Sequence, residues 1–320
     1  MGQCHCNFID KTRFDELRVK GIGPNEQNEF KLEFDAHCKL GYGQGKRPFQ
    51  DAFFGMGPPR LDNCYIFCVF DGFGPNLQAA HVVRNYIELY FEERVKRISA
   101  CSSEFEVIDF LNDALVAAED KLLNDGFDYS MDGTCCCFAY ISEKKCIIVN
   151  LGNCQAYLYR RDNTKVKPIR LCQVHDLANN AERQRILSGN AKLRERENKK
   201  GGRFYIDETQ PGITATRGIG AFKYKKLFIA EPEVETIDLD ERDLFIVMAT
   251  DGLWDVMTPE EVGEFVLLHE EKEGTAEDLL DLAGERWKII NEDKRTFIGI
   301  GDEAEVQDGG DDITAVITFL

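Results

Sequence analysis

An unbroken apolar run that ends in an aspartate limits what this chain can fold into more than any other stretch. Seven apolar residues from Cys64 to Phe70, rich in aromatic and β-branched types, lead directly into Asp71. Such a run is typical of a buried β-strand, and we expect Gly72 and Gly74 to end it. Asp71 would then lie at the rim of a sheet, where its charge is costly unless a cation, an arginine or a helix N-terminus compensates it. The simpler interpretation is an aspartate that caps its own turn.

Acidic turns at the ends of strand-like runs occur three more times. They are Asp251-Gly252 after the apolar run 245–249, Asp311-Asp312 before the run 313–317, and Gln50-Asp51 shortly after Lys46-Arg47. Carboxylates with few nitrogen or sulfur ligands nearby suit hard cations such as Mg²⁺ or Mn²⁺. Each turn alone is weak evidence, but together the four predict a centre that holds two metal ions.

The overall charge and the apolar content exclude several classes of protein. The chain has 320 residues with 39 Lys and Arg against 57 Asp and Glu, which gives a net charge of −18. An acidic surface argues against nucleic acid as a partner, because phosphate backbones are met by Lys and Arg. The 43% of hydrophobic residues suffices for a large core, but no apolar run reaches the roughly 20 residues of a membrane span, and no secretory signal opens the chain.

The twelve cysteines predict a reducing compartment. They occur singly in strand-like runs or as the block Cys135-Cys136-Cys137, which is not the pattern of a disulfide framework. A structural zinc site is not expected either, because there is no C-x-x-C pair. A cytoplasmic location is the simplest interpretation.

The N-terminus carries part of a lipidation signal. Gly2 is placed for N-myristoylation, although Cys6 stands where Ser or Thr is preferred. Cys4 and Cys6 could each carry a second acyl group, and stable anchoring usually takes two signals. Membrane contact is therefore expected only through acylation at these positions, and the alternative is an ordinary disordered terminus.

The order of the predicted elements indicates the fold class. Strands are expected at 28–43, 134–141, 145–151, 155–160 and the C-terminus, and helices at 77–98, 105–123, after Thr258-Pro259, and from 275 to about 291. Strands in runs and helices in pairs favour an α+β fold, with two antiparallel sheets packed face to face and helices outside them. We expect an extension at 1–27 and a single domain at 28–320. Within it, the basic segment 178–205 is either a solvated loop or a flap that faces phosphate.

Six motifs along the chain resemble those of the type 2C protein phosphatases, the metal-dependent Ser/Thr phosphatase (PPM) family. In chain order they are Val69-Phe70-Asp71-Gly72-Phe73-Gly74, Gly133-Thr134, Asn150-Leu151-Gly152-Asn153-Cys154-Gln155-Ala156, Thr216-Arg217-Gly218-Ile219-Gly220, Ala249-Thr250-Asp251-Gly252-Leu253-Trp254-Asp255-Val256 and Asp311-Asp312-Ile313-Thr314. The resemblance covers residues 28–320 and implies a four-layer α-β-β-α sandwich with the metals at one end. It also implies phosphoprotein substrates, a role in signalling and a monomer.

The resemblance implies a role for each acidic turn. Asp71 would bridge two Mn²⁺ or Mg²⁺ ions, with the carbonyl group of Gly72 on one of them. Asp251 and Asp311 would hold the first ion and Asp51 the second. The ions would activate a water molecule for attack on the phosphorus of phosphoserine or phosphothreonine. A basic side chain must meet the phosphoryl oxygens, and between Lys46 and Arg47 the bidentate guanidinium favours Arg47.

Three departures from the family pattern lead us to expect slow turnover. Phe73 stands where many members have a histidine that protonates the leaving group, and general acid catalysis is typically worth ~10²–10⁴-fold. Asn153 and Ala221 each replace an aspartate, which makes a third metal ion unlikely to bind. The main alternative is a pseudophosphatase, the same fold acting as a binding or regulatory scaffold.

A cysteine phosphatase is a weaker alternative. Cys154 and Arg160 have the C-x₅-R spacing of that nucleophile and its arginine. Such a loop must wrap its amides around an anion, whereas 155–159 alternates like a strand. We therefore interpret the spacing as coincidence.

Overall fold

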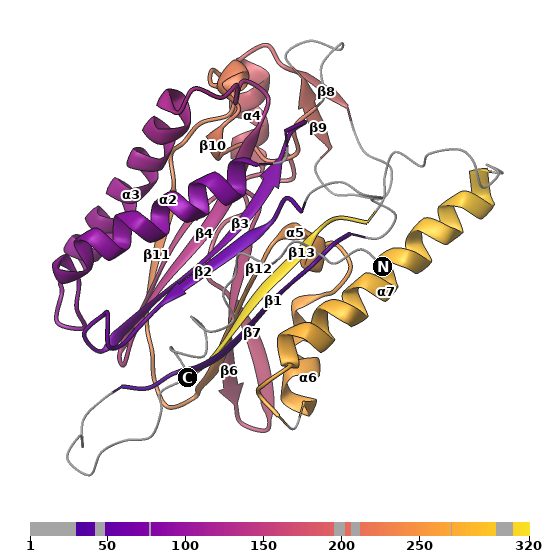
Figure 1. Ribbon diagram of the computed structural model, residues 1–320. Helices are drawn as coiled ribbons and strands as arrows, with labels where there is room; N and C mark the ends of the chain where they lie inside the picture. The colour runs from indigo at the N-terminus through magenta and orange to yellow at the C-terminus, as the bar shows by residue number, and fades with distance from the viewer. Residues whose placement is uncertain are drawn as a thin grey trace, which may run out of the picture.

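Two antiparallel sheets form the centre of the molecule (Figure 1). The computed structural model describes residues 30–41, 49–76, 78–194, 202–205, 212–269, 271–298 and 310–320. In strand order the first sheet contains β1 (Glu33–Lys39), β13 (Ile313–Phe319), β12 (Asp243–Ala249), β6 (Gln155–Asp162) and β7 (Lys165–Arg170). The second contains β11 (Glu233–Asp238), β5 (Lys145–Leu151), β4 (Gly133–Ser142), β3 (Cys64–Phe73) and β2 (Ala52–Met56), with β10 (Ile219–Gly220) also paired to β4.

Helices cover the outer face of each sheet. The helices α2 (Ala79–Arg94) and α3 (Glu104–Asn124) lie on the second sheet, and α6 (Pro259–Leu268) and α7 (Thr275–Ile298) lie on the first (Figure 1). A single turn, α5 (Asp251–Trp254), directly follows β12. The segment after β7 holds α4 (Asn180–Ser188) and the small hairpin of β8 (Lys192–Arg194) and β9 (Arg203–Tyr205). This is the four-layer α-β-β-α sandwich predicted from the sequence.

Alternation along β3 shows how the layers are filled. Phe70 belongs to the apolar cluster under α2 and α3, together with Cys64, Ile66 and Cys68. Tyr65, Phe67 and Val69 belong to the cluster between the sheets. Because successive side chains of a strand point to opposite faces, Asp71 continues the row that faces the other sheet. Burial on both faces therefore directs this carboxylate toward the middle of the sandwich.

Local sequence signals account for several element ends. Ser103 starts α3 and Thr258 starts α6, each with a capping box completed by a glutamate at the third helical position. The strand β3 is longer than predicted, because Asp71 and Gly72 remain paired with Cys135 and Thr134 of β4. The turn comes only at Gly74, whose φ of +113° is a conformation that favours glycine.

Two exclusions from the sequence can be compared with the described residues. The ten cysteines among them are all free. No helix in the described ranges is long and apolar enough to cross a membrane. Gly2, Cys4 and Cys6 lie outside the described residues, so N-terminal acylation stays a prediction.

Candidate metal centre

The acidic turns meet where strands from both sheets end. Three glycines pack against the backbone there: a Cβ atom at Gly72 would lie 2.3 Å from the carbonyl oxygen of Gln50, one at Gly252 would lie 2.1 Å from that of Asp312, and one at Gly41 would lie 1.9 Å from that of Gly310. Contacts this close require glycine. They bring the segments that carry Asp51, Asp71, Asp251 and Asp311 to one end of the sandwich.

Asp51 is held by the segment that precedes Asp251. Its side chain is 2% exposed, and its Oδ2 accepts a 2.8 Å hydrogen bond from the hydroxyl of Thr250. The same hydroxyl oxygen accepts a 3.0 Å bond from the amide of Thr314, and the amide of Thr250 donates in turn to the carbonyl of Thr314. One threonine therefore ties the start of β2, the end of β12 and the start of β13 together.

Asp71 is placed by its strand and by β4. The hydroxyl of Thr134 donates a 3.0 Å hydrogen bond to its backbone carbonyl, which fixes the end of β3. Burial raises the pKa of Asp71 well above its usual range, and the charges of Asp251, Asp51 and Asp311 add to the rise. Burial likewise raises the pKa of Asp51, with further contributions from the neighbouring aspartates. Asp51 and Asp71 therefore each lie near enough to Asp251 and Asp311 to be affected by their charges.

Asp251 begins α5 and has an amide partner. Nδ2 of Asn153 donates a 2.8 Å hydrogen bond to Oδ2 of Asp251. The other polar atom of that amide, Oδ1 of Asn153, is buried without a hydrogen-bond partner. A buried polar group of this kind is usually satisfied by water or an ion. Asn153 thus orients one acidic group and leaves an acceptor at the centre.

Asp312 has a structural role that the sequence did not reveal. Its Oδ1 accepts from the amide of Gly41 and its Oδ2 from the amide of Gln50, both at 2.8 Å. The carboxylate thereby joins the end of β1 to the residue before Asp51. In the sequence Asp312 is marked only by its position next to Asp311. That position does not show which of the two aspartates binds backbone amides and which is the candidate metal ligand.

The donor set fits hard divalent cations, although the carboxylates are not already gathered around a single point. Within the described ranges, no three His, Cys, Asp or Glu side chains are close enough to form a ready-made metal site. The acidic groups at this end are nonetheless all oxygen donors, which is what Mg²⁺ and Mn²⁺ prefer. Their mutual repulsion would be relieved by positive charge. Lys46 and Arg47 lie outside the described residues, so the phosphate-binding role of Arg47 stays a prediction.

Phe73, at the position where many family members have the leaving-group acid, makes an aromatic contact. The ring of Phe73 meets that of Phe228 edge to face, with centroids 5.5 Å apart, and a Cβ atom at Gly133 would lie 2.6 Å from its Cζ. Phe73 therefore packs as part of the core between the sheets. Ala221 is fully buried and adopts a left-handed conformation with φ of +49°, while its amide donates to the carbonyl of Asp132.

The structure removes the basis for a cysteine nucleophile at Cys154. This residue is fully buried, and burial raises the pKa of its thiol well above the usual range. The residues that follow form β6, so their amides are spread along a strand and do not surround an anion. Arg160 instead pairs with Asp243, at 2.6 Å from Nε to Oδ1.

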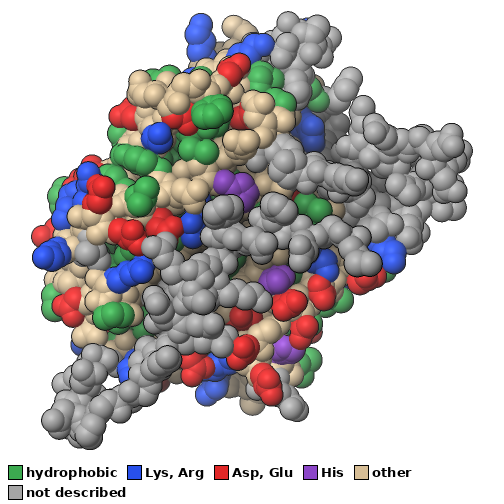
Figure 2. Space-filling model, viewed as in Figure 1, with side chains coloured by type: hydrophobic (Ala, Val, Ile, Leu, Met, Phe, Trp, Pro, Cys, Tyr) green, Lys and Arg blue, Asp and Glu red, His purple; other side chains and the backbone are tan. Residues whose placement is uncertain are grey.

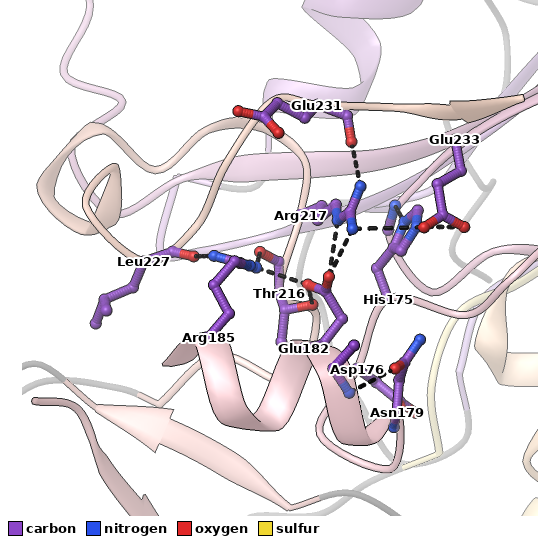
Figure 3. A network of polar contacts seen from close by, with 12 residues as sticks. His175, Asp176, Asn179, Glu182, Arg185, Thr216, Arg217, Leu227, Glu231 and Glu233 are labelled. Atoms are coloured by element: carbon purple, nitrogen blue, oxygen red, sulfur yellow. Dashed lines mark hydrogen bonds and ion pairs between the residues drawn. The ribbon is translucent and has the colours of Figure 1, made fainter. Parts of the chain in front are cut away.

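A buried carboxylate joins α4 to the segment before β10 (Figure 3). Glu182 accepts hydrogen bonds from Arg217, Arg185 and the hydroxyl of Thr216. Burial alone would raise the pKa of Glu182, but these bonds outweigh it and lower the pKa to about 2. At least part of the basic segment 178–205 is therefore neither a solvated loop nor free to face phosphate, because Arg185 is bound to Glu182.

His175 connects this network to the loop that carries Asn153 (Figure 3). Its Nδ1 accepts a 3.0 Å hydrogen bond from the amide of Gly152, and its Nε2 lies 3.4 Å from a carboxylate oxygen of Glu233. Burial, together with the charge of Arg217, lowers the pKa of His175. The neutral ring thus supports the turn that directs Asn153 toward Asp251.

Comparison with known proteins agrees with this geometry. A sequence model of the family described as Protein phosphatase 2C matches residues 45–287. The chain is similar to Probable protein phosphatase 2C 14 of Arabidopsis thaliana, with 30% identity over 233 residues that cover 70% of this chain and 47% of the relative. It is also similar to mouse Protein phosphatase 1B, with 25% identity over 288 residues, 81% of this chain and 65% of the relative. The chain spans about half of the length of several curated relatives that it matches.

Solved structures share the fold. The serine-threonine phosphatase 2C of Toxoplasma gondii superposes with a TM-score of 0.70 at 17% identity, over 91% of this chain and 96% of that one. A sex-determining protein of C. elegans superposes with a TM-score of 0.66, also at 17% identity, over 90% of this chain and 64% of that one. The family match extends over far more than half of this sequence, and the sandwich and its acidic strand ends agree with it, so the chain belongs to the protein phosphatase 2C family.

Proposed function

We propose that this chain is a metal-dependent protein serine/threonine phosphatase that hydrolyses phosphoserine and phosphothreonine. The observation that carries the proposal is the arrival of Asp51, Asp71, Asp251 and Asp311 at one end of the sandwich, where burial and the charges of the neighbouring aspartates raise the pKa of Asp51 and of Asp71. Buried like charges cost stability unless a cation or a proton compensates them. A scaffold that only binds partners has no need for them.

The chain's own residues account for binding and orientation. Asp71 would hold both metal ions, with the Gly72 carbonyl on one of them, while Asp251 and Asp311 would hold the first ion and Asp51 the second. Two Mn²⁺ or Mg²⁺ ions, when bound, supply the Lewis acidity that makes water a nucleophile at neutral pH and that neutralises charge at phosphorus. Thr250 holds Asp51 in place, Asn153 holds Asp251, and Arg47 would bind the phosphoryl oxygens.

The aromatic packing of Phe73 supports a particular substrate dependence. Phenylalanine cannot donate a proton, so an alkoxide leaving group departs without help from this position. We infer slow turnover of phosphoserine and phosphothreonine compared with aryl phosphates, whose leaving groups need no proton. We also propose a cytoplasmic monomer with phosphoprotein substrates, whose membrane contact depends on acylation at Gly2, Cys4 or Cys6.

The test is hydrolysis of an aryl phosphate and of a phosphothreonine peptide, with Mn²⁺ and with EDTA. We expect metal-dependent hydrolysis of both, lost in Asp251→Asn. A pseudophosphatase would bind Mn²⁺ in calorimetry but hydrolyse neither substrate. Hydrolysis that survives EDTA but is lost after thiol alkylation would instead point to cysteine chemistry.

A further inference from the structure

A pocket of about 740 Å³ is lined by Trp254 and Asp255, which follow Asp251 along the chain. It lies between the strands β6 and β7, the segment before α4, and the segment from α5 to α6. Its volume falls within the range of typical ligand sites, which combine apolar or aromatic walls with a few polar groups. None of these lining residues is among the proposed metal ligands, so the pocket is a separate candidate binding site.

Two aromatic rings form one wall. Tyr157 and Trp254 lie with ring centroids 4.9 Å apart. The Tyr157 ring already carries a cation, because the guanidinium of Arg170 lies 5.6 Å from its centroid. Arg170 is kept there by 3.0 Å and 2.8 Å hydrogen bonds to the Tyr157 hydroxyl. The indole of Trp254, whose Nε1 donates to the carbonyl of Ala249, offers a second ring, and Trp is the best ring for cation–π contact.

Carboxylates dominate the charge of the opposite wall. Glu261 is neutralised by Arg286, at 2.9 Å. Asp176 and Asp255 both line the pocket and lie close enough for their charges to repel. Burial raises the pKa of Asp176, and the charge of Asp255 acts in the same direction, while hydrogen bonds from the amides of Ala178 and Asn179 to its Oδ1 oppose the rise. The side chain of Arg170 donates hydrogen bonds to the neutral oxygens of Gln155 and Tyr157, and its charge only partly offsets that of Asp176. A cation between the two aspartates would relieve their repulsion.

The pocket is within a few residues' reach of the reacting phosphate. Asp251 starts α5, and Trp254 and Asp255 follow within one helical turn, a rise of about 6 Å. An extended peptide advances about 3.3–3.6 Å per residue. A phosphoresidue at the aspartates would therefore place a side chain two to four positions away in this pocket.

We propose that this pocket binds a lysine or arginine side chain of the phosphoprotein substrate, against Trp254 and between Asp176 and Asp255. The inference rests on the proposed phosphatase function and specifies the substrate class for that site. The wider surface agrees with it, since acidic side chains gather over α6 and α7 (Figure 2) in a chain of net charge −18. Such a field favours encounters with basic segments.

The first experiment compares phosphothreonine peptides in which one residue, at each position from −4 to +4, is either arginine or citrulline. Citrulline keeps the shape of arginine and removes its charge. We expect kcat/KM to be about three- to tenfold higher for arginine at one or two positions. A ratio near one at every position, with the peptides still hydrolysed, would overturn the pocket proposal alone.

Two variants, one that removes a negative charge of the pocket and one that removes a positive charge, then test whether the preference arises there. Asp255→Asn should bring the arginine-to-citrulline ratio close to one, whereas Arg170→Gln should increase it, because it removes a competing cation. Glu235→Gln, on the exposed part of β11, is the matched control and should leave the ratio unchanged. Damage to the fold would not shift the ratio in opposite directions. Equal ratios in all variants would place the preference elsewhere.

A binding measurement separates this proposal from catalysis. The chain has two tryptophans, and Trp287 is only 4% exposed, so acrylamide quenching reports mainly on Trp254. The unphosphorylated arginine peptide should protect this indole, and the citrulline peptide should protect it less. This outcome is expected even if no peptide is hydrolysed. Equal protection by both peptides would contradict recognition of a cation.

Discussion

The hydroxyl of Thr250 donates a 2.8 Å hydrogen bond to the carboxylate of Asp51, a residue 199 positions earlier in the chain. The contact joins β2 of one sheet to the end of β12 in the other. It also stabilises the charged form of Asp51, while burial and the neighbouring aspartates favour the protonated form. The acidic centre therefore depends on a neutral side chain that is itself not a ligand.

Thr250→Val should weaken metal binding without removing a ligand. The substitution keeps the shape but leaves Asp51 and the Thr314 amide without their partner, and a buried group left unpaired costs about 1–3 kcal/mol. We expect a loss of stability in this range and Mn²⁺ affinity about three- to thirtyfold lower, measured by calorimetry. Thr236→Val on β11 is the control. Unchanged affinity in Thr250→Val would show that the hydrogen bond does not support the site.

Asp51→Asn should make the metal-free protein more stable. The raised pKa of Asp51 means that the folded state binds this proton more tightly than the unfolded state does. Stability is therefore lost as pH rises from the unfolded pKa through the folded one, and the penalty is fully present above it. Removing the charge should raise the free energy of unfolding at pH 7.5 in EDTA by ~1–2 kcal/mol.

The same variant should respond weakly to metal. Wild-type protein should gain thermal stability with Mn²⁺, because a ligand that binds only the folded state stabilises it. Asp51→Asn should gain much less. If the wild type is more stable than the variant in EDTA, other groups of the protein must already stabilise the negative charge of Asp51.

Glu182→Gln should destabilise the protein by ~3 kcal/mol, because it removes the charge that both Arg185 and Arg217 contact. Arg217 is then left with the more distant Glu233. The pKa of Glu182 is lowered to about 2, so its contribution is present above the unfolded pKa and is lost as pH falls from about 4.5 toward 2. Urea unfolding should thus show a larger difference between variant and wild type at pH 7 than at pH 3, where part of the contribution is already lost. Glu235→Gln serves as the exposed control, and equal effects of the two variants would refute the role of the network.

Phe73→His should change the dependence of rate on the leaving group. Wild-type kcat/KM should fall steeply as the pKa of the leaving alcohol rises, since no proton donor is present at this position. A histidine there should flatten the dependence and raise the rate for phosphothreonine peptides by roughly tenfold, toward the low end of general acid catalysis. Phe73→Leu is the control for lost ring packing against Phe228. A histidine variant with the wild-type slope would show that this position is not directed at the leaving group.

Signals local to the sequence predicted most of the fold. The unbroken apolar run 64–70 and the capping box of Thr258 and Glu261 are set by residues that are neighbours in the chain, so they can be recognised without the structure. A second cap was available but missed: Asn179 precedes Glu182 by three residues, and α4 begins there.

Interactions between distant segments could not be predicted in the same way. The end of β3 was placed too early because glycine usually breaks a strand, whereas pairing with β4 carries the strand through Gly72. The division of roles between Asp311 and Asp312 depends on the amides of Gly41 and Gln50, which only folding brings near. The packing of Phe73 on Phe228 likewise joins positions far apart in sequence.

The most direct test of the account is calorimetric titration of the metal-stripped protein with Mn²⁺, alongside Asp71→Asn. We predict two ions per chain for the wild type, and the loss of both in the variant, because Asp71 would bridge them. Hydrolysis of an aryl phosphate should appear as the second ion binds. A wild-type chain that binds no Mn²⁺, or an Asp71→Asn variant that binds as the wild type does, would contradict the central claim that these aspartates form one metal centre.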